Sequence, residues 1–270
     1  MKPLVDYRDR VAIVTGASSG IGAGLARGLA RRGARVALVA RRRDRLEALA
    51  DEIGRAGGTA WAVPCDIEQR SEVEAAAKAV AERFGRLDIL VNNAGRARHA
   101  LFKDHDVEDI ERLMRVNYFS VVYWIKAVLP ALRARREGWI VNLSSVAGRL
   151  GQPDESAYAA TKFAVAGLSE SLTYEFDPLG IHVLCVHPAL VRTEMFDDAT
   201  LARMPERVKR TFMEVEPFCE EVFAALGRGA YELTVPRYVG FAYVMRVLAP
   251  RVLRRQMAQI RLPALPDLTT

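Results

Sequence analysis

Two hydroxyl groups, a phenol and an amine occur near the middle of the chain, as Ser144, Ser145, Tyr158 and Lys162. If a helix begins at Tyr158, Lys162 lies one turn further along the same face, so that its ammonium group can approach the phenol. A free phenol has a pKa of about 10, and a nearby cation favours the phenolate, so we expect the pair to act as a general acid or base. Because this spacing is also common on solvated helices, the interpretation depends on the surrounding elements.

A glycine-rich turn near the N-terminus is the second group of residues with a chemical use. The apolar run at residues 11–14 predicts a buried strand, and leucines at helical spacing predict a helix that ends at Gly33. Between a strand and a helix, glycines let backbone N–H groups approach a pyrophosphate. Such turns can also simply join two elements, but this context favours phosphate binding. The expected contacts are Gly16, Ser18, Ser19, Gly20, Ile21 and Gly22.

Three arginines follow the second predicted strand, which spans residues 34–40. In a nucleotide-binding sheet this position faces the adenosine ribose, where an acid binds the 2′-hydroxyl and an arginine accepts a 2′-phosphate. Here the chain has Arg41, Arg42 and Arg43 before the first acid, Asp44. The sequence therefore predicts NADPH rather than NADH as the cofactor, with Arg41 and Arg42 as contacts and Arg43 on a solvated helix start.

Strand and helix patterns alternate along the rest of the chain. Strands are expected at residues 59–63, 87–91, 139–143 and 181–186, with helices between them, one of which opens with a Ser71-x-x-Glu74 capping box. Repeated units of this kind predict an α/β fold with a doubly wound parallel sheet, the Rossmann fold. The turns that follow the strands should then form one site at the carboxyl edge of the sheet.

A predicted long helix at residues 107–136 is apolar on nearly all sides in its middle, which is typical of a buried helix or a subunit contact. Asn117 lies inside this apolar run, where an amide group needs hydrogen-bond partners. The strand before the helix ends in Asn92-Asn93-Ala94-Gly95, a turn that we expect to lie against the cofactor.

Composition and charge limit the classes of protein that fit. The chain has 270 residues, of which 50% are hydrophobic and 27% charged, as in a soluble globular protein. No secretory signal is recognised, and three widely spaced cysteines favour neither disulfides nor a zinc site, so we expect a cytoplasmic location. The four histidines lack metal-ligand spacing, and no metal site is predicted. Six arginines and one acid give residues 237–270 a charge of +5 of the total +6, but no nucleic-acid motif accompanies them.

The motifs, taken in order, resemble those of the short-chain dehydrogenase/reductase family over residues 8–193. The similar features are Thr-Gly-x-x-x-Gly-x-Gly, Asp66, Asn-Asn-Ala-Gly, Asn117, Ser145 and Tyr-x-x-x-Lys. The resemblance implies that Tyr158 is the general acid of carbonyl reduction and that Lys162 lowers its pKa and binds the nicotinamide ribose. It implies that Ser145, rather than Ser144, polarises the substrate and that Asn117 supports a water in a proton relay.

The same resemblance implies further contacts with NADP(H) along the carboxyl edge of the sheet. They are Asp66, Ile67, Asn93, Ala94, Gly95, Tyr158, Lys162, Pro188, Val191 and Thr193. The chain departs from the family at Ala189, where glycine commonly follows the proline. We expect the extra methyl group to narrow the backbone options and to crowd the nicotinamide side.

Two functions of different classes fit these residues. The first is an NADPH-dependent oxidoreductase that interconverts a carbonyl and a secondary or primary alcohol on a small hydrophobic substrate. The second is a non-catalytic NADP-binding sensor or interaction protein on the same fold. The presence of Asn117, Ser145, Tyr158 and Lys162 favours the enzyme. Steroid, retinoid, keto-acyl, quinone and small-ketone substrates are all compatible with the sequence.

We expect a single domain over residues 1–270, with residues 8–193 as its cofactor-binding and catalytic core. Residues 194–235 are interpreted as a substrate-covering segment and a last strand, and residues 236–270 as a basic extension. The covering segment is rich in methionine and phenylalanine, which fit a lid over a hydrophobic substrate or ordinary core packing. These apolar residues are Met195, Phe196, Leu201, Met204, Val208, Phe212 and Met213.

The basic extension is predicted to be helical from Arg237 to Arg261, with a break at Pro250. In its second half arginines fall on one side and apolar residues on the other. Such a segment can pack on the body or on a second subunit, which is the favoured interpretation, and it can also lie on an anionic membrane surface or attract an anionic substrate. We expect a homodimer or homotetramer and no nucleic-acid partner.

Overall fold

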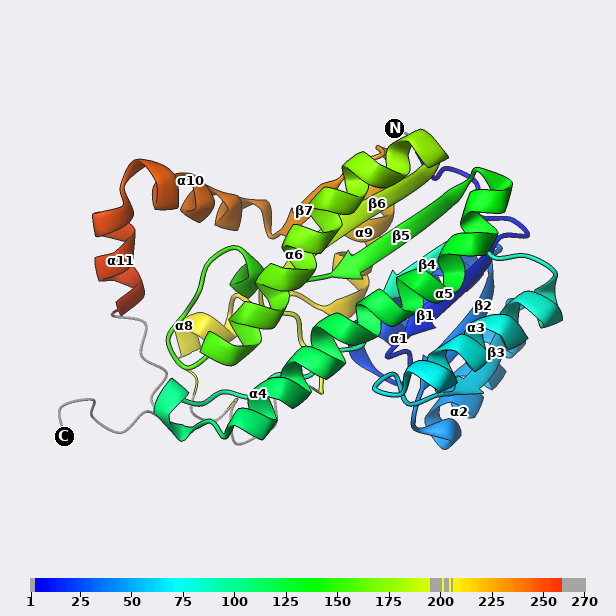
Figure 1. The fold of residues 1–270 in the computed structure, drawn as a ribbon, viewed down its shortest axis with the longest axis horizontal. Helices are drawn as coiled ribbons and strands as arrows, with labels where there is room; N and C mark the ends of the chain where they lie inside the picture. The colour runs from blue at the N-terminus through cyan, green and yellow to red at the C-terminus, as the bar shows by residue number, and fades with distance from the viewer. Residues whose placement is uncertain (1–2, 195–200, 202–203, 205, 259–270) are drawn as a thin grey trace.

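The computed structural model of the protein describes residues 3–194, 201, 204 and 206–258. Seven parallel strands form one sheet in the order β3-β2-β1-β4-β5-β6-β7, with helices on both faces (Figure 1). The strands are β1 Val11–Thr15, β2 Arg35–Ala40, β3 Thr59–Pro64, β4 Ile89–Asn92, β5 Gly138–Leu143, β6 Ile181–Pro188 and β7 Glu232–Val235. This arrangement confirms the predicted doubly wound α/β fold.

The helices form a layer on each side of the sheet. Those of the described residues are α1 Gly20–Arg31, α2 Arg43–Arg55, α3 Arg70–Phe84, α4 Val107–Met114, α5 Ser120–Arg135, α6 Ser156–Phe176, α8 Glu206–Lys209, α9 Val215–Gly227, α10 Gly240–Leu248 and α11 Pro250–Ala258. Helices α1, α2 and α9 share one buried cluster with the sheet, and α3, α5 and α6 share the other.

Strand β1 shows why the sheet is covered on both faces. Ala12 and Val14 belong to one buried cluster, and Val11 and Ile13 belong to the other. Successive side chains of a strand point to opposite faces, so an uninterrupted apolar run requires helices on each side. The chain leaves β1 toward β2 and β3, and then returns to β4 on the other side of β1. The carboxyl ends of β1 and β4 therefore lie at the point where the strand order reverses, where ligands of such sheets bind.

The predicted helix at residues 107–136 is interrupted. Between α4 and α5 the chain forms a π-helical segment, η2, at Arg115–Phe119. The predicted capping box before α3 is wrong, because α3 begins at Arg70 after Gln69, which makes no side-chain cap. The Glu74 carboxylate accepts instead from Arg70 Nε at 2.7 Å. In both places hydrogen bonds that the sequence pattern does not reveal decide the local geometry.

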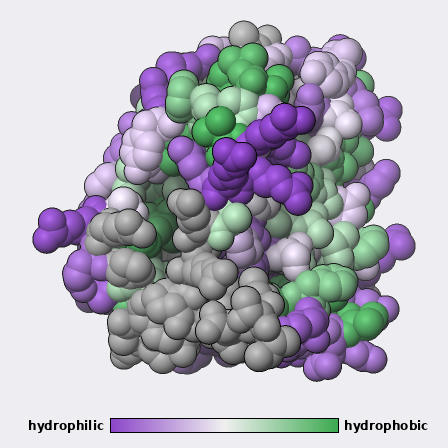
Figure 2. All heavy atoms as spheres, turned by 90° about the vertical axis from the view of Figure 1, so that its left-hand side faces the viewer, coloured by the Kyte–Doolittle hydropathy of each residue, from purple (hydrophilic) through white to green (hydrophobic). Residues whose placement is uncertain are grey.

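The C-terminal arm, residues 237–258, follows β7, the edge strand on the side of the sheet opposite β3, and extends away from the sheet there (Figure 1). It comprises a short 3₁₀ turn, η5 Arg237–Val239, then α10 and α11, which meet at Ala249. Figure 2 looks at the molecule from this side. The expected helix with a break at Pro250 is thus present over the described residues, and the end of the predicted helix at Arg261 lies outside them. No described helix is long and apolar enough to cross a membrane.

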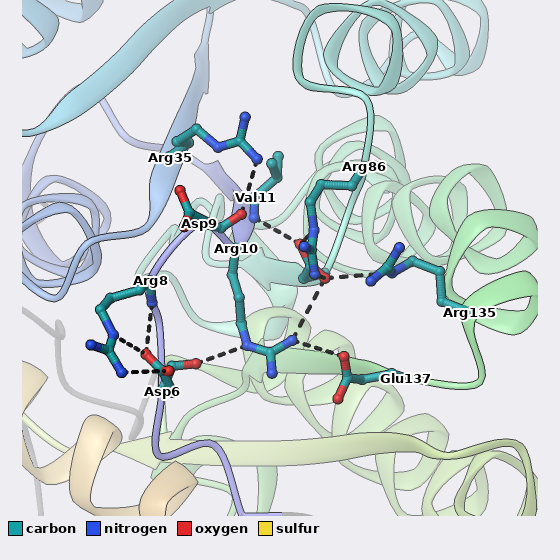
Figure 3. A network of polar contacts seen from close by, with 10 residues as sticks. Asp6, Arg8, Asp9, Arg10, Val11, Arg35, Arg86, Arg135 and Glu137 are labelled. Atoms are coloured by element: carbon teal, nitrogen blue, oxygen red, sulfur yellow. Dashed lines mark hydrogen bonds and ion pairs between the residues drawn. The ribbon is translucent and has the colours of Figure 1, made fainter.

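A buried carboxylate joins the amino ends of the central strands (Figure 3). Asp88, which is fully buried, precedes β4 and accepts from the N–H of Val11 at 2.8 Å. Arg86 donates to it through Nε at 2.8 Å and Nη2 at 2.6 Å. Arg10 and Arg135 each place a guanidinium nitrogen 3.7 Å from Oδ1. This network lies at the edge opposite the predicted site, so its role is structural.

Candidate active site

Helix α6 and the turn after β5 bring the predicted acid–base residues together. Tyr158 and Lys162 are both buried on α6, and the side chain of Ser145 lies near enough to the phenol of Tyr158 to lower its pKa. Ser145 also caps the 3₁₀ turn η3 (Val146–Gly148), because its Oγ accepts from the N–H of Ala147 at 3.1 Å. Lys162 Nζ donates to the carbonyl oxygen of Leu143 at 2.9 Å and lies 5.7 Å from the centre of the Tyr158 ring. A proton donor, a hydroxyl group and a cation thus share one site.

The protonation of this pair differs from the sequence prediction. Burial raises the pKa of Tyr158, the charge of Glu155 raises it further, and the hydrogen bond from Ser145 lowers it only in part. Burial also lowers the pKa of Lys162 to about 8. The ammonium group is bound to a backbone carbonyl at the end of β5 and does not offset these effects on the phenol. Tyr158 is therefore a protonated phenol at neutral pH, which is the form that can donate a proton.

Asn117 occupies the π-helical segment and is fully buried. Its Nδ2 donates to the carbonyl oxygen of Arg96 at 2.8 Å and to Thr161 Oγ1 at 3.0 Å, and its Oδ1 accepts from the N–H of Arg96 at 2.8 Å. A Cβ atom added to Gly95 would lie 3.3 Å from this oxygen and 3.5 Å from Lys162 Nζ. π-helical segments are frequent at functional sites. Here the segment ties the turn after β4 to the residue that precedes Lys162.

The glycine turn after β1 packs closely on the turn after β4. Gly16 has φ +66°, and an added Cβ would lie 2.8 Å from Asn93 Nδ2. Gly20 has φ +54°, and an added Cβ would lie 3.0 Å from the methyl group of Thr193. Only glycine meets both demands without strain. Ser19, the N-cap of α1, makes no side-chain cap, so first-turn N–H groups of α1 can serve an anion.

Arg42 is the arginine that reaches the glycine turn. Its Nη2 donates to Ser18 Oγ at 2.9 Å and to Ser19 Oγ at 3.0 Å. The carboxylate of Glu194 lies 3.4 Å from Arg42 Nη1 and 2.7 Å from Arg45 Nη1. A carboxylate held by two guanidinium groups beside two hydroxyl groups shows that this donor set suits an oxyanion. Arg41 is exposed and pairs with no residue that the structure describes.

The other predicted cofactor contacts lie at the same edge. Asp66 and Ile67 follow β3, and the Oδ1 atom of Asp66 caps the next turn by accepting from the N–H of Glu68 at 3.1 Å. Pro188 ends β6, and Val191 forms a parallel bridge with Met213. The structure thus brings the predicted contacts to one side of the sheet, and their role in binding stays a prediction.

Ala189 fits its position without backbone strain. The residue is not among those with positive φ, and its N–H donates to the carbonyl oxygen of Val235 at 2.8 Å. An L-residue is therefore accommodated where glycine was expected. In the covering segment, Met195 and Phe196 lie outside the described residues, and Met204 is buried.

Four buried residues support the site without having been predicted as catalytic or cofactor-binding residues, although Ser144 and Thr15 belong to motifs noted in the sequence. Thr15 Oγ1 accepts from the N–H groups of Asn93 and Ala94, both at 3.0 Å. Thr161 Oγ1 donates to the carbonyl oxygen of Tyr158 at 2.7 Å. Ser144 Oγ donates to the carbonyl oxygen of Lys162 at 2.8 Å. Each of these three stands next to a motif residue in the sequence, which is the one signal that could have identified it.

The fourth supporting residue is His187, which lies fully buried on β6 behind Ser145. Its Nδ1 is 3.1 Å from the carbonyl oxygen of Ser145, and its Nε2 is 3.2 Å from Glu232 Oε1. Burial favours the neutral ring, but hydrogen bonds with Cys185 and Glu232 outweigh it and raise the pKa of His187 to about 9. His187 therefore holds the backbone of Ser145 to the last strand. Among the described residues, no group of three or more His, Cys, Asp or Glu could hold a metal ion.

Comparisons with known proteins agree with this architecture. The sequence profile described as short chain dehydrogenase matches residues 10–203. The chain is 40% identical over 207 residues to the oxidoreductase UcpA of Salmonella typhimurium, covering 76% of this chain and 78% of that protein. It is 32% identical over 264 residues to dehydrogenase/reductase SDR family member 7B of Bos taurus, covering 93% and 81%. A crystal structure of a dehydrogenase/reductase from Sinorhizobium meliloti 1021 superimposes with a TM-score of 0.75 at 34% identity, covering 85% of this chain and 94% of that one.

The fold and the site define an oxidoreductase on a dinucleotide-binding sheet. The chain belongs to the short-chain dehydrogenase/reductase family, as its motifs predicted. Members of this family use the nucleotide cofactors NAD(P)(H), and the glycine turn beside Arg42 fits such a group.

Glu155 provides a pH test of the site. It lies three residues before Tyr158, with Oε1 3.4 Å from His99 Nδ1. Burial raises the pKa of Glu155 from 4.5 to about 7, so between these values the folded protein holds a proton that the unfolded chain releases. The stability that depends on this proton is fully present below pH 4.5 and is lost as the pH rises through 7. In the wild-type protein the free energy of unfolding should fall by up to about 3 kcal/mol between about pH 5 and about pH 8 because of Glu155, and Glu155→Gln should abolish this part of the fall. Urea unfolding at the two pH values measures it.

The matched control is Glu175→Gln, at an exposed position in α6, the helix that follows Glu155. It should keep the pH dependence of the wild-type protein. If Glu155→Gln kept that dependence too, the carboxyl group of Glu155 would not be the group that titrates.

Proposed function

We propose that the protein is an NADPH-dependent oxidoreductase that reduces a carbonyl group on a small hydrophobic substrate to an alcohol, or catalyses the reverse reaction. The observation that carries this proposal is the burial of Tyr158, Ser145 and Lys162 together at the carboxyl edge of the sheet, beside the glycine turn. A sensor that only bound the nucleotide would not need a buried phenol with a serine hydroxyl and a lysine beside it.

Each residue has a defined task in this reaction. NADP(H) supplies the hydride when it is bound. Tyr158 donates its phenolic proton to the substrate oxygen, and Ser145 stabilises the charge that develops there. Lys162 is positioned by the carbonyl oxygen of Leu143, and its lowered pKa lets it take part in returning a proton to Tyr158 near neutral pH. Asn117 keeps the turn at Arg96 in place against α6.

The surroundings of Tyr158 support a hydrophobic substrate. Tyr158, Ala147 and Ala159 form a small buried apolar cluster on which Ala97 packs. Small side chains beside the phenol leave room for apolar carbon next to the reacting carbonyl group. The methionine- and phenylalanine-rich segment after Thr193 is proposed as the cover of this site.

The preference for NADPH rests on Arg42. Its guanidinium group already bridges the two serine hydroxyls of the glycine turn, and Arg45 adds a second positive charge through the shared Glu194. A 2′-phosphate could replace the carboxylate of Glu194 in this donor set. Arginine suits this task because its planar group binds phosphate through two nitrogens.

We expect Arg42→Ala to raise KM for NADPH at least about tenfold, because a hydrogen bond to a charged group contributes roughly 1.5–3 kcal/mol. KM for NADH, which has no 2′-phosphate, should change little. Steady-state kinetics with both cofactors measure the difference. Arg41→Ala, measured in the same assay, tests the other predicted contact with the 2′-phosphate.

Arg43→Ala is the control for this experiment, since Arg43 is exposed and pairs with Glu47 at 3.4 Å on its own helix. It should change neither KM. Equal effects of Arg42→Ala on NADPH and NADH would contradict the assignment of Arg42 to the 2′-phosphate.

The activity itself is tested with a panel of ketones, aldehydes and quinones that differ in the length of their apolar part. NADPH consumption should be coupled to alcohol formation and should rise with that length. Tight binding of NADPH without turnover in either direction would favour the second candidate, a nucleotide-binding sensor.

A homodimer or homotetramer in the cytoplasm completes the proposal. A groove lined by residues of α6 and β7, among them Ala166, Tyr174 and Glu232, lies along the edge of the sheet and offers a surface to a second copy. All three cysteines are unpaired, which fits a reducing compartment.

A further inference from the structure

The C-terminal arm presents an unusual concentration of exposed apolar side chains. Of the eleven large hydrophobic side chains that are exposed in the described part of the chain, six lie between residues 238 and 252. Five of them form one surface, which we term the outer apolar face: Tyr238, Phe241, Val244, Val247 and Leu248. Their exposed fractions run from 49% for Val244 to 78% for Val247. A cluster of this kind on a soluble protein marks a binding surface.

The spacing shows that this exposure belongs to one side of α10. Phe241, Val244 and Leu248 recur at helical intervals and are exposed, whereas Ala242, Tyr243 and Met245 are partly buried and the hydroxyl group of Tyr243 is fully buried. Arg246 fixes the inner side to the body, because it donates to the carbonyl oxygen of Arg149 and lies 5.3 Å from the centre of the Phe163 ring. The outer apolar face is therefore turned away from the protein by contacts made on the opposite side.

The charge of the arm indicates what it binds. The arm contains five arginines and no acid over residues 237–258. Arg251, Arg254 and Arg255 fall on one side of α11, are exposed, and form no ion pair with any residue in the described ranges. Leu253, between them, is buried. In Figure 2 the hydrophobic surface of the arm adjoins a strongly hydrophilic ridge.

A second copy of this chain is a poor occupant for this surface. A two-fold contact brings the same patch of both subunits together, so the arginines of one arm would face those of the other. An anionic bilayer matches both the outer apolar face and the arginines of α11, since its phosphates pair with arginines while apolar side chains enter the region below the headgroups. The helices of the arm are too short to span the bilayer, so the arm would lie on it.

We propose that the C-terminal arm docks the protein on the surface of an anionic phospholipid bilayer. The outer apolar face of α10 inserts between the headgroups, and Arg251, Arg254 and Arg255 bind lipid phosphates. The inner side of the arm lies against elements that carry the active site, because Arg246 contacts Arg149, which follows the turn that Ser145 caps, and Phe163, which follows Lys162. Together with the proposed function, on which this step rests, the docking would let a lipophilic carbonyl compound reach Tyr158 directly from the membrane.

The experiment is flotation of the full-length protein with two kinds of vesicle, phosphatidylcholine alone and phosphatidylcholine mixed with phosphatidylglycerol. We expect binding to the anionic vesicles only, weakened by added salt. Charge reversal by Arg251→Glu, Arg254→Glu and Arg255→Glu together should reduce binding at least about tenfold. Phe241→Ser with Leu248→Ser should reduce it as well, because apolar insertion adds to the charge.

The matched control reverses three exposed arginines elsewhere, Arg55, Arg133 and Arg228, and should leave vesicle binding within about twofold. Equal losses in the control and the arm variant would overturn the proposal, since net charge alone would then explain binding. The proposal would also be overturned if the protein did not bind anionic vesicles, or if light scattering showed that the arm variants change the oligomeric state.

Vesicle binding is measured without cofactor or substrate, so it is separate from the proposed reaction. Circular dichroism and turnover of a water-soluble carbonyl compound show whether the variants are folded and active. Loss of flotation in an arm variant that keeps its turnover supports docking by the arm. Flotation of a protein that shows no turnover would contradict the proposed function but not the docking.

Discussion

Replacing Tyr158 with phenylalanine is expected to lower kcat at least about a hundredfold, because a general acid contributes roughly 10²–10⁴ to the rate. The change removes one oxygen atom and leaves the ring packed against Ala147 and Ala159. Lys162 keeps its hydrogen bond to Leu143, and the glycine turn is untouched. Affinity for NADPH should therefore stay within a factor of about two. Steady-state kinetics and a fluorescence titration measure the two quantities.

The control is Tyr174→Phe, on the same helix, where the side chain is 73% exposed. It should retain wild-type kcat. Substantial activity in Tyr158→Phe would remove Tyr158 from the chemistry, and a parallel loss of NADPH binding would assign the residue to the cofactor alone.

The second large effect is expected on stability, at the opposite edge of the sheet. Asp88→Ala should lower the free energy of unfolding by about 3 kcal/mol, since it leaves the partly buried guanidinium groups around it without their anion and the N–H of Val11 without an acceptor. The midpoint of thermal unfolding should fall on the order of 10 °C. Scanning calorimetry measures both changes. Asp88→Asn, which keeps the shape, should lie between the wild type and Asp88→Ala.

Asp6→Ala is the matched control, because Asp6 also pairs with an arginine, Arg8, at 3.0 Å, but on the exposed surface (Figure 3). Surface pairs contribute little, so the unfolding midpoint should not change. If both variants unfolded at the same temperature, burial of the Asp88 network would not be a source of stability.

The fold could be predicted because its signals are local. The apolar run at Val11–Val14 leads directly into a glycine turn and a helix, and the same alternation recurs along the chain. Such patterns fix the order of strands and helices, and the handedness of the crossovers then leaves few arrangements. Residues at the strand ends, such as Asn93 and Ser145, could be placed at one edge for the same reason.

What could not be predicted depends on contacts between distant residues. The sequence pointed first to Arg41, yet Arg42 bonds to the serines of the glycine turn, which depends on how α2 begins. The π-helical segment arises around Asn117, whose partners Arg96 and Thr161 lie 21 and 44 residues away. The protonation of Tyr158 depends on its burial and on Glu155, neither of which a Tyr-x-x-x-Lys spacing reveals.

The most direct test of the proposed function is a fluorescence titration of the wild-type protein with NADPH and with NADH, since it requires no knowledge of the substrate. A charged hydrogen bond contributes roughly 1.5–3 kcal/mol, and we therefore predict that NADPH binds at least about tenfold more tightly than NADH. Equal or tighter binding of NADH would contradict the role of Arg42, and binding of neither nucleotide would contradict the assignment of this site as the place where a reductase holds its cofactor.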